Sequence, residues 1–216
     1  METGRTKKEA LHILLYVPNI IGYIRILLIL LGSLYLEYPA TFLCFYCISA
    51  SLDFIDGWAA RTLNQQSSFG AWLDVIIDNL SRTLLWTHVF RWGWMVSSVE
   101  WITFVCNHQV GAKWREKCYK SEAVKLNVTV PAFVEKVMAN GFKTPLGFLV
   151  ISGSHVLPIW IYGIESSFLE NYLPFAFCVG VGLVLGIGRL ICLSVELWCI
   201  QKHIRELLWE DQIEAA

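Results

Sequence analysis

Charged residues are scarce in this sequence. Only 16% of its 216 residues are Asp, Glu, Lys or Arg, and 56% are hydrophobic, whereas about 25% of a typical soluble domain is charged. Neither sign of charge is in excess, because 17 basic and 18 acidic residues leave a formal net charge of −1. The high hydrophobicity and low net charge exclude a disordered chain. The missing basic excess argues against a protein that binds nucleic acid.

The sequence also lacks the even number of cysteines that a complete disulfide framework needs. The chain has seven cysteines, and most of them fall within or at the ends of apolar runs. Cys44 and Cys47 share the spacing of a redox or metal-binding pair. We favour the simpler interpretation that they are small, polarizable side chains packed between helices.

Long apolar runs dominate the sequence instead. A membrane-spanning helix needs about 20 largely apolar residues. Ten Trp and eight Tyr among these runs are typical of the aromatic belts at membrane surfaces. We therefore expect an all-α, polytopic membrane bundle of six transmembrane helices, formed by a single domain over residues 1–216. The six predicted spans are 19–37, 39–56, 70–95, 94–107, 145–164 and 173–200.

Nearly all Lys and Arg residues fall in segments that six spans would leave on one side of the membrane. These segments are the N-terminal tail, the 57–69 connection, the 108–143 connection and the C-terminal tail. Cytosolic loops carry an excess of Lys and Arg. Both termini and the 108–143 connection are therefore predicted to be cytosolic.

Four carboxylates interrupt the second and third apolar runs. Asp53 and Asp56 are three residues apart, and Asp74 and Asp78 are four apart. Each pair therefore lies on one face of its helix. Because a short polar connection joins the two helices, they are antiparallel neighbours, and the four side chains meet at one depth near the cytosolic boundary.

Divalent metal ions would balance this concentration of negative charge. One charge in hydrocarbon costs about 2.5–3.5 kcal/mol on insertion scales, and only one base, Arg61, is predicted on the same face. Oxygen ligands without His or Cys favour Mg²⁺, Mn²⁺ or Ca²⁺ over zinc. Four carboxylates suit two ions that clamp a phosphoryl group. The alternative is a buried ion-pair network that only locks the two helices together.

These aspartates belong to a longer pattern, D-x2-D-G-x2-A-R-x8-G-x3-D-x3-D, over residues 53–78. It resembles the motif of the CDP-alcohol phosphatidyltransferases, six-helix membrane enzymes that use Mg²⁺ or Mn²⁺. Residues 17–25 and 59–65 resemble the eukaryotic phosphatidylinositol synthase branch of that family. The chain is predicted to be a member of that branch or a divergent paralogue.

The resemblance implies a role for each residue of the motif. Two metal ions would be ligated by Asp53, Asp56, Asp74 and Asp78. Asp78 would also be the catalytic general base, which deprotonates the incoming alcohol. The nucleotide of the donor would be bound by Gly57, Ala60, Arg61 and Gly70. Further candidates for contacts with phosphate or acceptor are Asn19, Arg25 and Arg82.

The implied reaction transfers a phosphatidyl group from CDP-diacylglycerol to a small alcohol, with an inositol-like acceptor favoured, and releases CMP. The expected location is the endoplasmic reticulum membrane, with the active site facing the cytosol. Gly182 and Gly186 have the spacing of a helix dimer seam, which predicts a homodimer. Tight packing inside the bundle is the alternative for this pair.

Two other functions remain open at this stage. Family members usually carry Lys or Arg after the last aspartate of the motif, whereas Asn79 follows Asp78 here. The residues around Glu100 and Thr144 also differ from the elements expected to recognise the acceptor. These differences favour, as one alternative, a catalytically inactive relative that binds lipid or nucleotide. The other alternative is an ion transporter, because carboxylates inside membranes can line ion paths.

Overall fold

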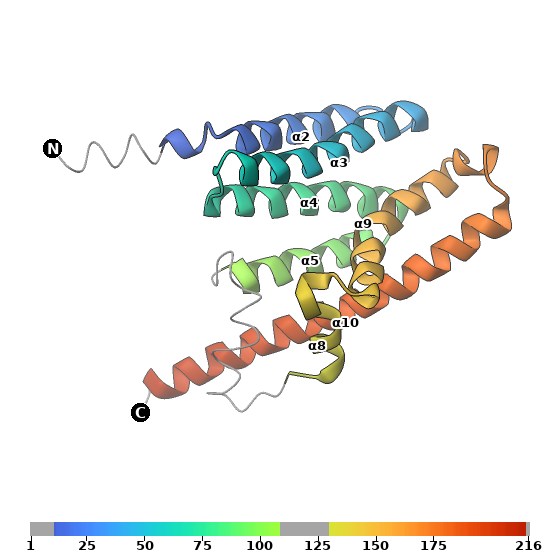
Figure 1. Cartoon of the computed structure of the whole chain (residues 1–216). Helices are drawn as coiled ribbons and strands as arrows, with labels where there is room; N and C mark the ends of the chain where they lie inside the picture. The colour runs from blue at the N-terminus through green and yellow to red at the C-terminus, as the bar shows by residue number, and fades with distance from the viewer. Residues whose placement is uncertain (1–10, 109–129, 215–216) are drawn as a thin grey trace. The chain divides into compact units, whose positions relative to one another are not determined.

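The second and third long helices carry the whole carboxylate motif. The computed structural model describes residues 11–108 and 130–214, and the regular structure in these ranges is entirely helical (Figure 1). The motif lies on α3 (Pro39–Thr62) and α4 (Ser68–Val89), and α2 (Val17–Ser33) precedes them. The remaining elements are α5 (Gly93–His108), α8 (Ala132–Met138), η2 (Ala139–Phe142), α9 (Pro145–Glu165), η3 (Leu169–Asn171) and α10 (Phe175–Glu214).

The long helices of the described ranges fall on the six predicted segments, but their ends differ. The helix predicted over 70–95 ends at Val89, and α10 continues past residue 200 to Glu214. The break after Val89 depends on Gly93, where a Cβ atom would lie 1.8 Å from the Trp86 carbonyl oxygen. Only glycine therefore allows α5 to begin so close to the end of α4.

Three described helical segments are long and apolar enough to cross a membrane. They are Pro39–Thr62, Pro145–Glu165 and Phe175–Trp209, and Val17–Ser33 is a shorter apolar helix. The protein is accordingly a membrane protein built of helices. The count of six spans and the side on which the termini lie stay predictions.

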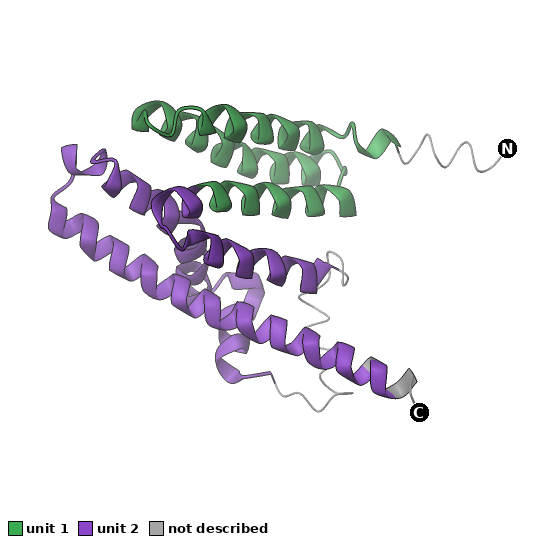
Figure 2. Ribbon diagram, turned by 180° about the vertical axis from the view of Figure 1, so that it is seen from behind, with its two compact units in different colours: residues 1–84 green, residues 85–216 purple. Residues whose placement is uncertain are grey.

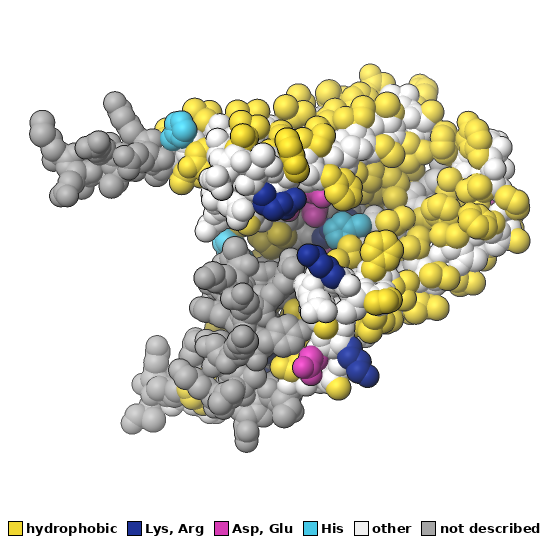
Figure 3. Space-filling view, viewed as in Figure 1, with side chains coloured by type: hydrophobic (Ala, Val, Ile, Leu, Met, Phe, Trp, Pro, Cys, Tyr) yellow, Lys and Arg dark blue, Asp and Glu magenta, His cyan; other side chains and the backbone are white. Residues whose placement is uncertain are grey.

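The chain divides into two compact units, residues 1–84 and residues 85–216 (Figure 2). In the first unit, α2 buries small and polar residues and exposes large apolar ones. Its buried positions are Asn19, Gly22, Arg25, Ile29 and Gly32. Lipid can cover the apolar outer face of such a helix, while small and polar residues pack against neighbouring helices. Hydrophobic side chains likewise cover much of the described surface seen in Figure 3.

Close packing brings α2 and α4 together beside the motif. A Cβ atom on Gly22 would lie 3.0 Å from Leu73 Cδ2, so this glycine permits the close approach. Farther along, Ile29 of α2 packs with Leu73 and Ile77 of α4 in a buried hydrophobic cluster. α2 also packs along α3. The residues of the motif therefore face a tightly packed third helix.

In the second unit, α5 and α9 pack on α10. Glycines bring the backbones of α9 and α10 into contact, since a Cβ on Gly153 would lie 2.4 Å from the Arg189 nitrogen. A Cβ on Gly188 would lie 2.3 Å from the Leu149 carbonyl oxygen. Small residues at helix crossings are typical of membrane bundles.

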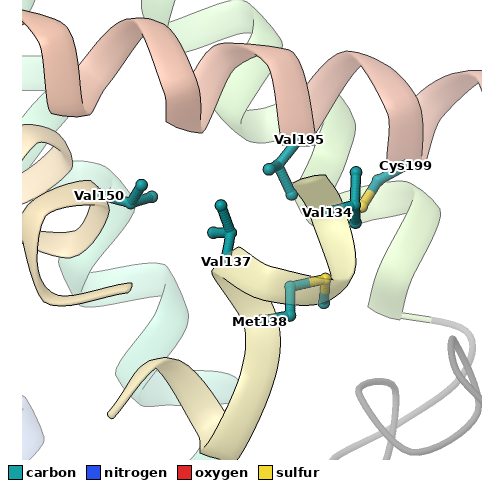
Figure 4. Close-up of a cluster of buried hydrophobic side chains, with 6 residues drawn as sticks. All are labelled: Val134, Val137, Met138, Val150, Val195 and Cys199. Carbon is teal, nitrogen blue, oxygen red and sulfur yellow. The ribbon is translucent and has the colours of Figure 1, made fainter. Parts of the chain in front are cut away.

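The sequence did not predict α8, which lies in the expected polar connection 108–143. Residues 109–129 of that connection are outside the described residues. α8 buries one face in a hydrophobic cluster (Figure 4) whose members are Val134, Val137, Met138, Val150, Val195 and Cys199. The chain then reverses through Asn140, Gly141 and Phe142, which all have positive φ. At the start of α9, the Thr144 hydroxyl accepts a hydrogen bond from the Gly147 nitrogen at 3.0 Å.

Candidate active site

A tight turn between α3 and α4 places the four motif aspartates opposite one another. In this turn Asn64 adopts φ 53°, a left-handed conformation that Asn tolerates better than most residues. Ser67 then starts α4, where its hydroxyl accepts a hydrogen bond from the Gly70 nitrogen at 3.0 Å. The returning helix brings a carboxylate oxygen of Asp74 within 4.8 Å of oxygens from Asp53 and Asp56.

The Arg25 guanidinium lies among all four carboxylates. Its Nη1 atom is 2.8 Å from Asp56 Oδ2 and 2.9 Å from Asp74 Oδ1. Its Nη2 atom is 2.8 Å from Asp53 Oδ1 and 3.0 Å from Asp78 Oδ1. Each terminal nitrogen thus joins one aspartate of α3 to one aspartate of α4. Arg25 is buried, whereas the aspartates are 13–47% exposed.

The position of Arg25 corrects the charge count made from the sequence. That count assigned Arg61 as the only base near the aspartates, but the structure adds Arg25 from a helix far away along the chain. Four carboxylates and one guanidinium still carry a formal charge of −3. Divalent cations therefore remain the simplest way to neutralise the cluster, because its donor set is all oxygen and suits Mg²⁺ or Mn²⁺.

Arg61 lies over Gly57 at the end of α3. A Cβ atom on Gly57 would be 3.4 Å from Arg61 Nη1, so the absence of a side chain at this position leaves room for the guanidinium. Arg61 is exposed and Ala60 is half-buried. The exposed guanidinium one turn beyond Asp56 offers planar donors for a phosphate group.

Asn19 lies beside Gly70. A Cβ on Gly70 would be 2.8 Å from Asn19 Oδ1, and Asn19 is buried. Its side-chain nitrogen donates a hydrogen bond to the Ile13 carbonyl at 2.6 Å. The Gln65 side chain also accepts a hydrogen bond from the Val17 nitrogen at 2.9 Å. Sequence spacing did not predict these contacts of Asn19 and Gln65, because the partners of both side chains lie on other elements.

Asn79, which directly follows Asp78, forms a buried pair with Arg82, about one helical turn farther along α4. The Arg82 guanidinium donates a hydrogen bond to Asn79 Oδ1, and both side chains are at most 7% exposed. The substitution of Asn for a base after the last aspartate is therefore accompanied by an arginine on the same helix surface. The structure thus places a positive charge near this position from the following turn.

A second ionic cluster lies in the other unit. Arg189 of α10 is 2.9 Å from Glu196 and 3.2 Å from Glu100 of α5, and all three residues are buried. Arg189 thus links two helices of that unit. Gly182 lies near Trp160, with a Cβ position 3.8 Å from the ring, whereas a Cβ on Gly186 would have no other residue of the described ranges within 4 Å.

Comparison with known proteins adds an independent observation. Residues 15–114 match the sequence profile described as CDP-alcohol phosphatidyltransferase. Among the relatives, a CDP-diacylglycerol–inositol 3-phosphatidyltransferase from Candida albicans is 42% identical over 84 residues, covering 38% of this chain and 36% of the relative. The enzyme of that name from Homo sapiens is 44% identical over 75 residues, covering 34% of this chain and 35% of the relative.

A third relative, CDP-diacylglycerol–inositol 3-phosphatidyltransferase 1 from Arabidopsis thaliana, is 40% identical over 82 residues. That alignment covers 38% of this chain and 36% of the relative. The chain therefore spans little more than a third of the length of the curated relatives it matches. No solved structure matches the chain significantly.

Proposed function

Because residues 15–114 match the CDP-alcohol phosphatidyltransferase profile, we propose that this protein transfers a phosphatidyl group from CDP-diacylglycerol to a small alcohol. CMP is the second product. The observation that carries the proposal is the convergence of four carboxylates on α3 and α4, next to an exposed arginine. The named relatives act on inositol, and an inositol-like acceptor is accordingly favoured.

The metal-binding residues in this proposal are Asp53, Asp56, Asp74 and Asp78. Their oxygen-only donor set and their uncompensated negative charge fit two Mg²⁺ or Mn²⁺ ions. When bound, the ions supply positive charge to the phosphoryl oxygens and to the departing CMP. The protein's own contribution is to hold the donor and the acceptor in line, since phosphoryl transfer depends mainly on positioning and charge stabilisation.

The donor lies against the small residues of the motif. Gly57, Ala60 and Gly70 let the CDP group approach the helix backbones, and Arg61 donates hydrogen bonds to its diphosphate. Asp78 accepts the proton of the alcohol. The alcohol oxygen then bonds to the β-phosphorus while the bond from that phosphorus to the bridging oxygen breaks. Asn19, Arg25 and Arg82 line the surroundings as further candidates for contacts with phosphate or acceptor.

The remaining parts of the proposal concern the whole chain. Residues 1–216 act as one domain in the endoplasmic reticulum membrane, the carboxylates face the cytosol, and the 108–143 connection lies on the same side. The spacing of Gly182 and Gly186 supports a homodimer.

The decisive assay measures CMP release from CDP-diacylglycerol by the purified full chain. It compares inositol, glycerol phosphate and serine as acceptors, with Mn²⁺ or Mg²⁺ present. We expect turnover that a chelator abolishes and added Mn²⁺ restores. No CMP with any acceptor, under conditions in which an established family member works, would refute the enzyme proposal.

The replacement Asp78→Asn tests the general base. We expect kcat to fall by about 10²–10⁴-fold, the usual contribution of general acid–base catalysis, with donor binding little changed. Asp211→Asn is the matched control, because Asp211 is exposed on α10 and should leave kcat unaltered. Normal turnover by the Asp78 variant would show that another group takes the proton.

A catalytically inactive relative remains the second candidate function, because Asn79 follows Asp78 where family members usually carry a base. If the Asn79–Arg82 pair does not replace that base, donor and metal would bind without turnover. Tight binding of CDP-diacylglycerol together with no CMP release would establish this second function.

A further inference from the structure

Arg25 occupies the space that the four aspartates enclose. One oxygen of each carboxylate points at the guanidinium, and the four contacts are 2.8–3.0 Å long. Three of these contacts are hydrogen bonds, which the guanidinium donates to Asp56, Asp74 and Asp78, and the contact with Asp53 is an ion pair. The remaining donor, Nε, is buried and has no hydrogen-bond partner among the described residues. The aspartates therefore hold the tip of the side chain and not its stem.

The same carboxylate groups are the ones that would ligate a divalent cation. Oxygens of Asp53, Asp56 and Asp74 lie within 4.8 Å of one another, and the guanidinium contacts these three residues together with Asp78. A divalent ion placed among them would lie next to a buried positive charge of the protein, where the repulsion is stronger than in water. Arg25 and the ion are thus alternative partners for one set of ligands.

The charge balance also favours competition between Arg25 and metal for the carboxylates. With Arg25 alone the cluster keeps a formal charge of −3, and two divalent ions alone would bring four carboxylates to zero. With Arg25 and two ions together the cluster would carry +1 before any substrate binds. The arginine is therefore needed when metal is absent and is in excess when metal is present.

We propose that Arg25 is an internal counter-ion that holds the four carboxylates in the metal-free protein and competes with divalent metal for them. This inference rests on the metal site of the proposed function. One consequence is that the first unit stays folded without metal. A second is that metal binding must release the guanidinium from its carboxylates. If the guanidinium occupies the cluster in about nine molecules of ten, the apparent dissociation constant for metal is weakened about tenfold.

The test is a Mn²⁺ titration of the purified full chain without donor, in which the electron paramagnetic resonance signal reports free Mn²⁺. We expect Arg25→Gln to bind Mn²⁺ about tenfold more tightly than the unchanged protein. Its metal-free melting temperature should be lower, and Mn²⁺ should raise it by more than it raises that of the unchanged protein. Arg205→Gln, at an exposed position of α10, is the matched control and should change neither quantity.

Equal or weaker Mn²⁺ binding by Arg25→Gln would overturn the proposal, because it would mean that the arginine supports the metal. If that variant does not fold, Arg25→Lys replaces it. A single ammonium group holds four carboxylates less well than a planar fork, so tighter Mn²⁺ binding is again expected, and equal or weaker binding again contradicts the proposal. Absence of Mn²⁺ binding by every variant would overturn it as well.

The CMP assay separates this inference from the proposed function. Tighter Mn²⁺ binding by Arg25→Gln, in a protein that turns over no acceptor, would leave the counter-ion role in place and reject the enzyme. Metal-dependent turnover by the unchanged protein, together with unchanged Mn²⁺ affinity in Arg25→Gln, would support the enzyme and reject the counter-ion role.

Discussion

Individual residues set the geometry around the carboxylates. Among the glycines beside them, Gly70 leaves the least room for a side chain. A Cβ there would lie 2.8 Å from Asn19 Oδ1 and 3.1 Å from Ser67 Oγ, both shorter than ordinary contacts to carbon. Asn19 cannot simply turn away, because it is buried and its amide holds the Ile13 carbonyl. Gly70 is thus required for packing as well as for its proposed contact with the donor.

We expect Gly70→Ala to lower the free energy of unfolding by about 1–3 kcal/mol, the usual cost of overpacking a well-filled site. Gly180→Ala is the matched control, because no other described residue comes within 4 Å of a Cβ at this helical position. Alanine is the better helix former by about 1 kcal/mol, so the control should be neutral or stabilising. Thermal unfolding in detergent measures both, and equal melting temperatures would contradict the predicted clash.

At the scale of helices, Arg189 ties α5 to α10. Its guanidinium contacts Glu100 on one helix and Glu196 on the other. Removing one partner of a buried ion pair is costly because the other charge remains buried without compensation. Glu196 lies two turns after Arg189 on the same helix, whereas Glu100 comes from α5.

We expect Arg189→Met to destabilise the protein by about 3–5 kcal/mol. The triple variant Arg189→Met, Glu100→Gln and Glu196→Gln should recover much of that loss, because it leaves no uncompensated charge. Arg205→Met, at an exposed position of the same helix, is the control. Chemical unfolding followed by Trp fluorescence compares them, and a single variant as stable as the control would refute the ionic link.

The short helix α8 adds a second prediction at this scale. Met138 is 2% exposed and packs in the cluster of Figure 4, whereas Phe133 on the same helix is 45% exposed. Met138→Ala should cost about 2–5 kcal/mol, and Phe133→Ala should cost much less. Melting temperatures of the two variants provide the measurement, and similar losses would mean that α8 does not pack as described.

The sequence could predict the helices and the pairing of aspartates for a definite physical reason. Apolar runs mark long helices, and spacings of three and four residues fix a face. A hairpin then brings two faces together, which is how Asp53 and Asp78 could be expected to meet. The partners of Arg25 could not be predicted in this way, because α2 packs through tertiary contacts that no spacing encodes.

The α8 helix escaped prediction for a different reason. It has only seven residues and follows a polar stretch, so too few apolar positions were present to form a periodic pattern. Its apolar face is defined by residues of α9 and α10 that are distant in sequence. The surroundings of Asn19 could not be predicted for the same reason, because its burial depends on Gly70 and Ile13 rather than on its neighbours along α2.

At the scale of the whole molecule, orientation in the membrane rests on where the basic residues fall. Six spans put the N-terminus, the α3–α4 turn and the C-terminus on one side, and the segment between α9 and α10 on the other. The positive-inside rule makes the first side cytosolic.

Glycosylation mapping in sealed microsomes tests this arrangement. An Asn-x-Thr acceptor sequence inserted with a spacer between α9 and α10, at 166–174, should be glycosylated. The same insertion between α3 and α4, at 63–67, should stay unmodified. Modification of the second insertion, or of neither, would contradict the predicted topology.

The burial of Arg25 among aspartates also bears on how the protein is made. In the predicted six-span topology, α2 is synthesised and enters the membrane before α3 and α4, so Arg25 would reach the membrane before any of its four acidic partners. A lone arginine near the middle of a lipid-facing helix costs about 2.5–3.5 kcal/mol on insertion scales, and this cost falls only when the following hairpin arrives. The first three helices are therefore expected to leave the translocation machinery as a group, with the arginine already matched to its carboxylates.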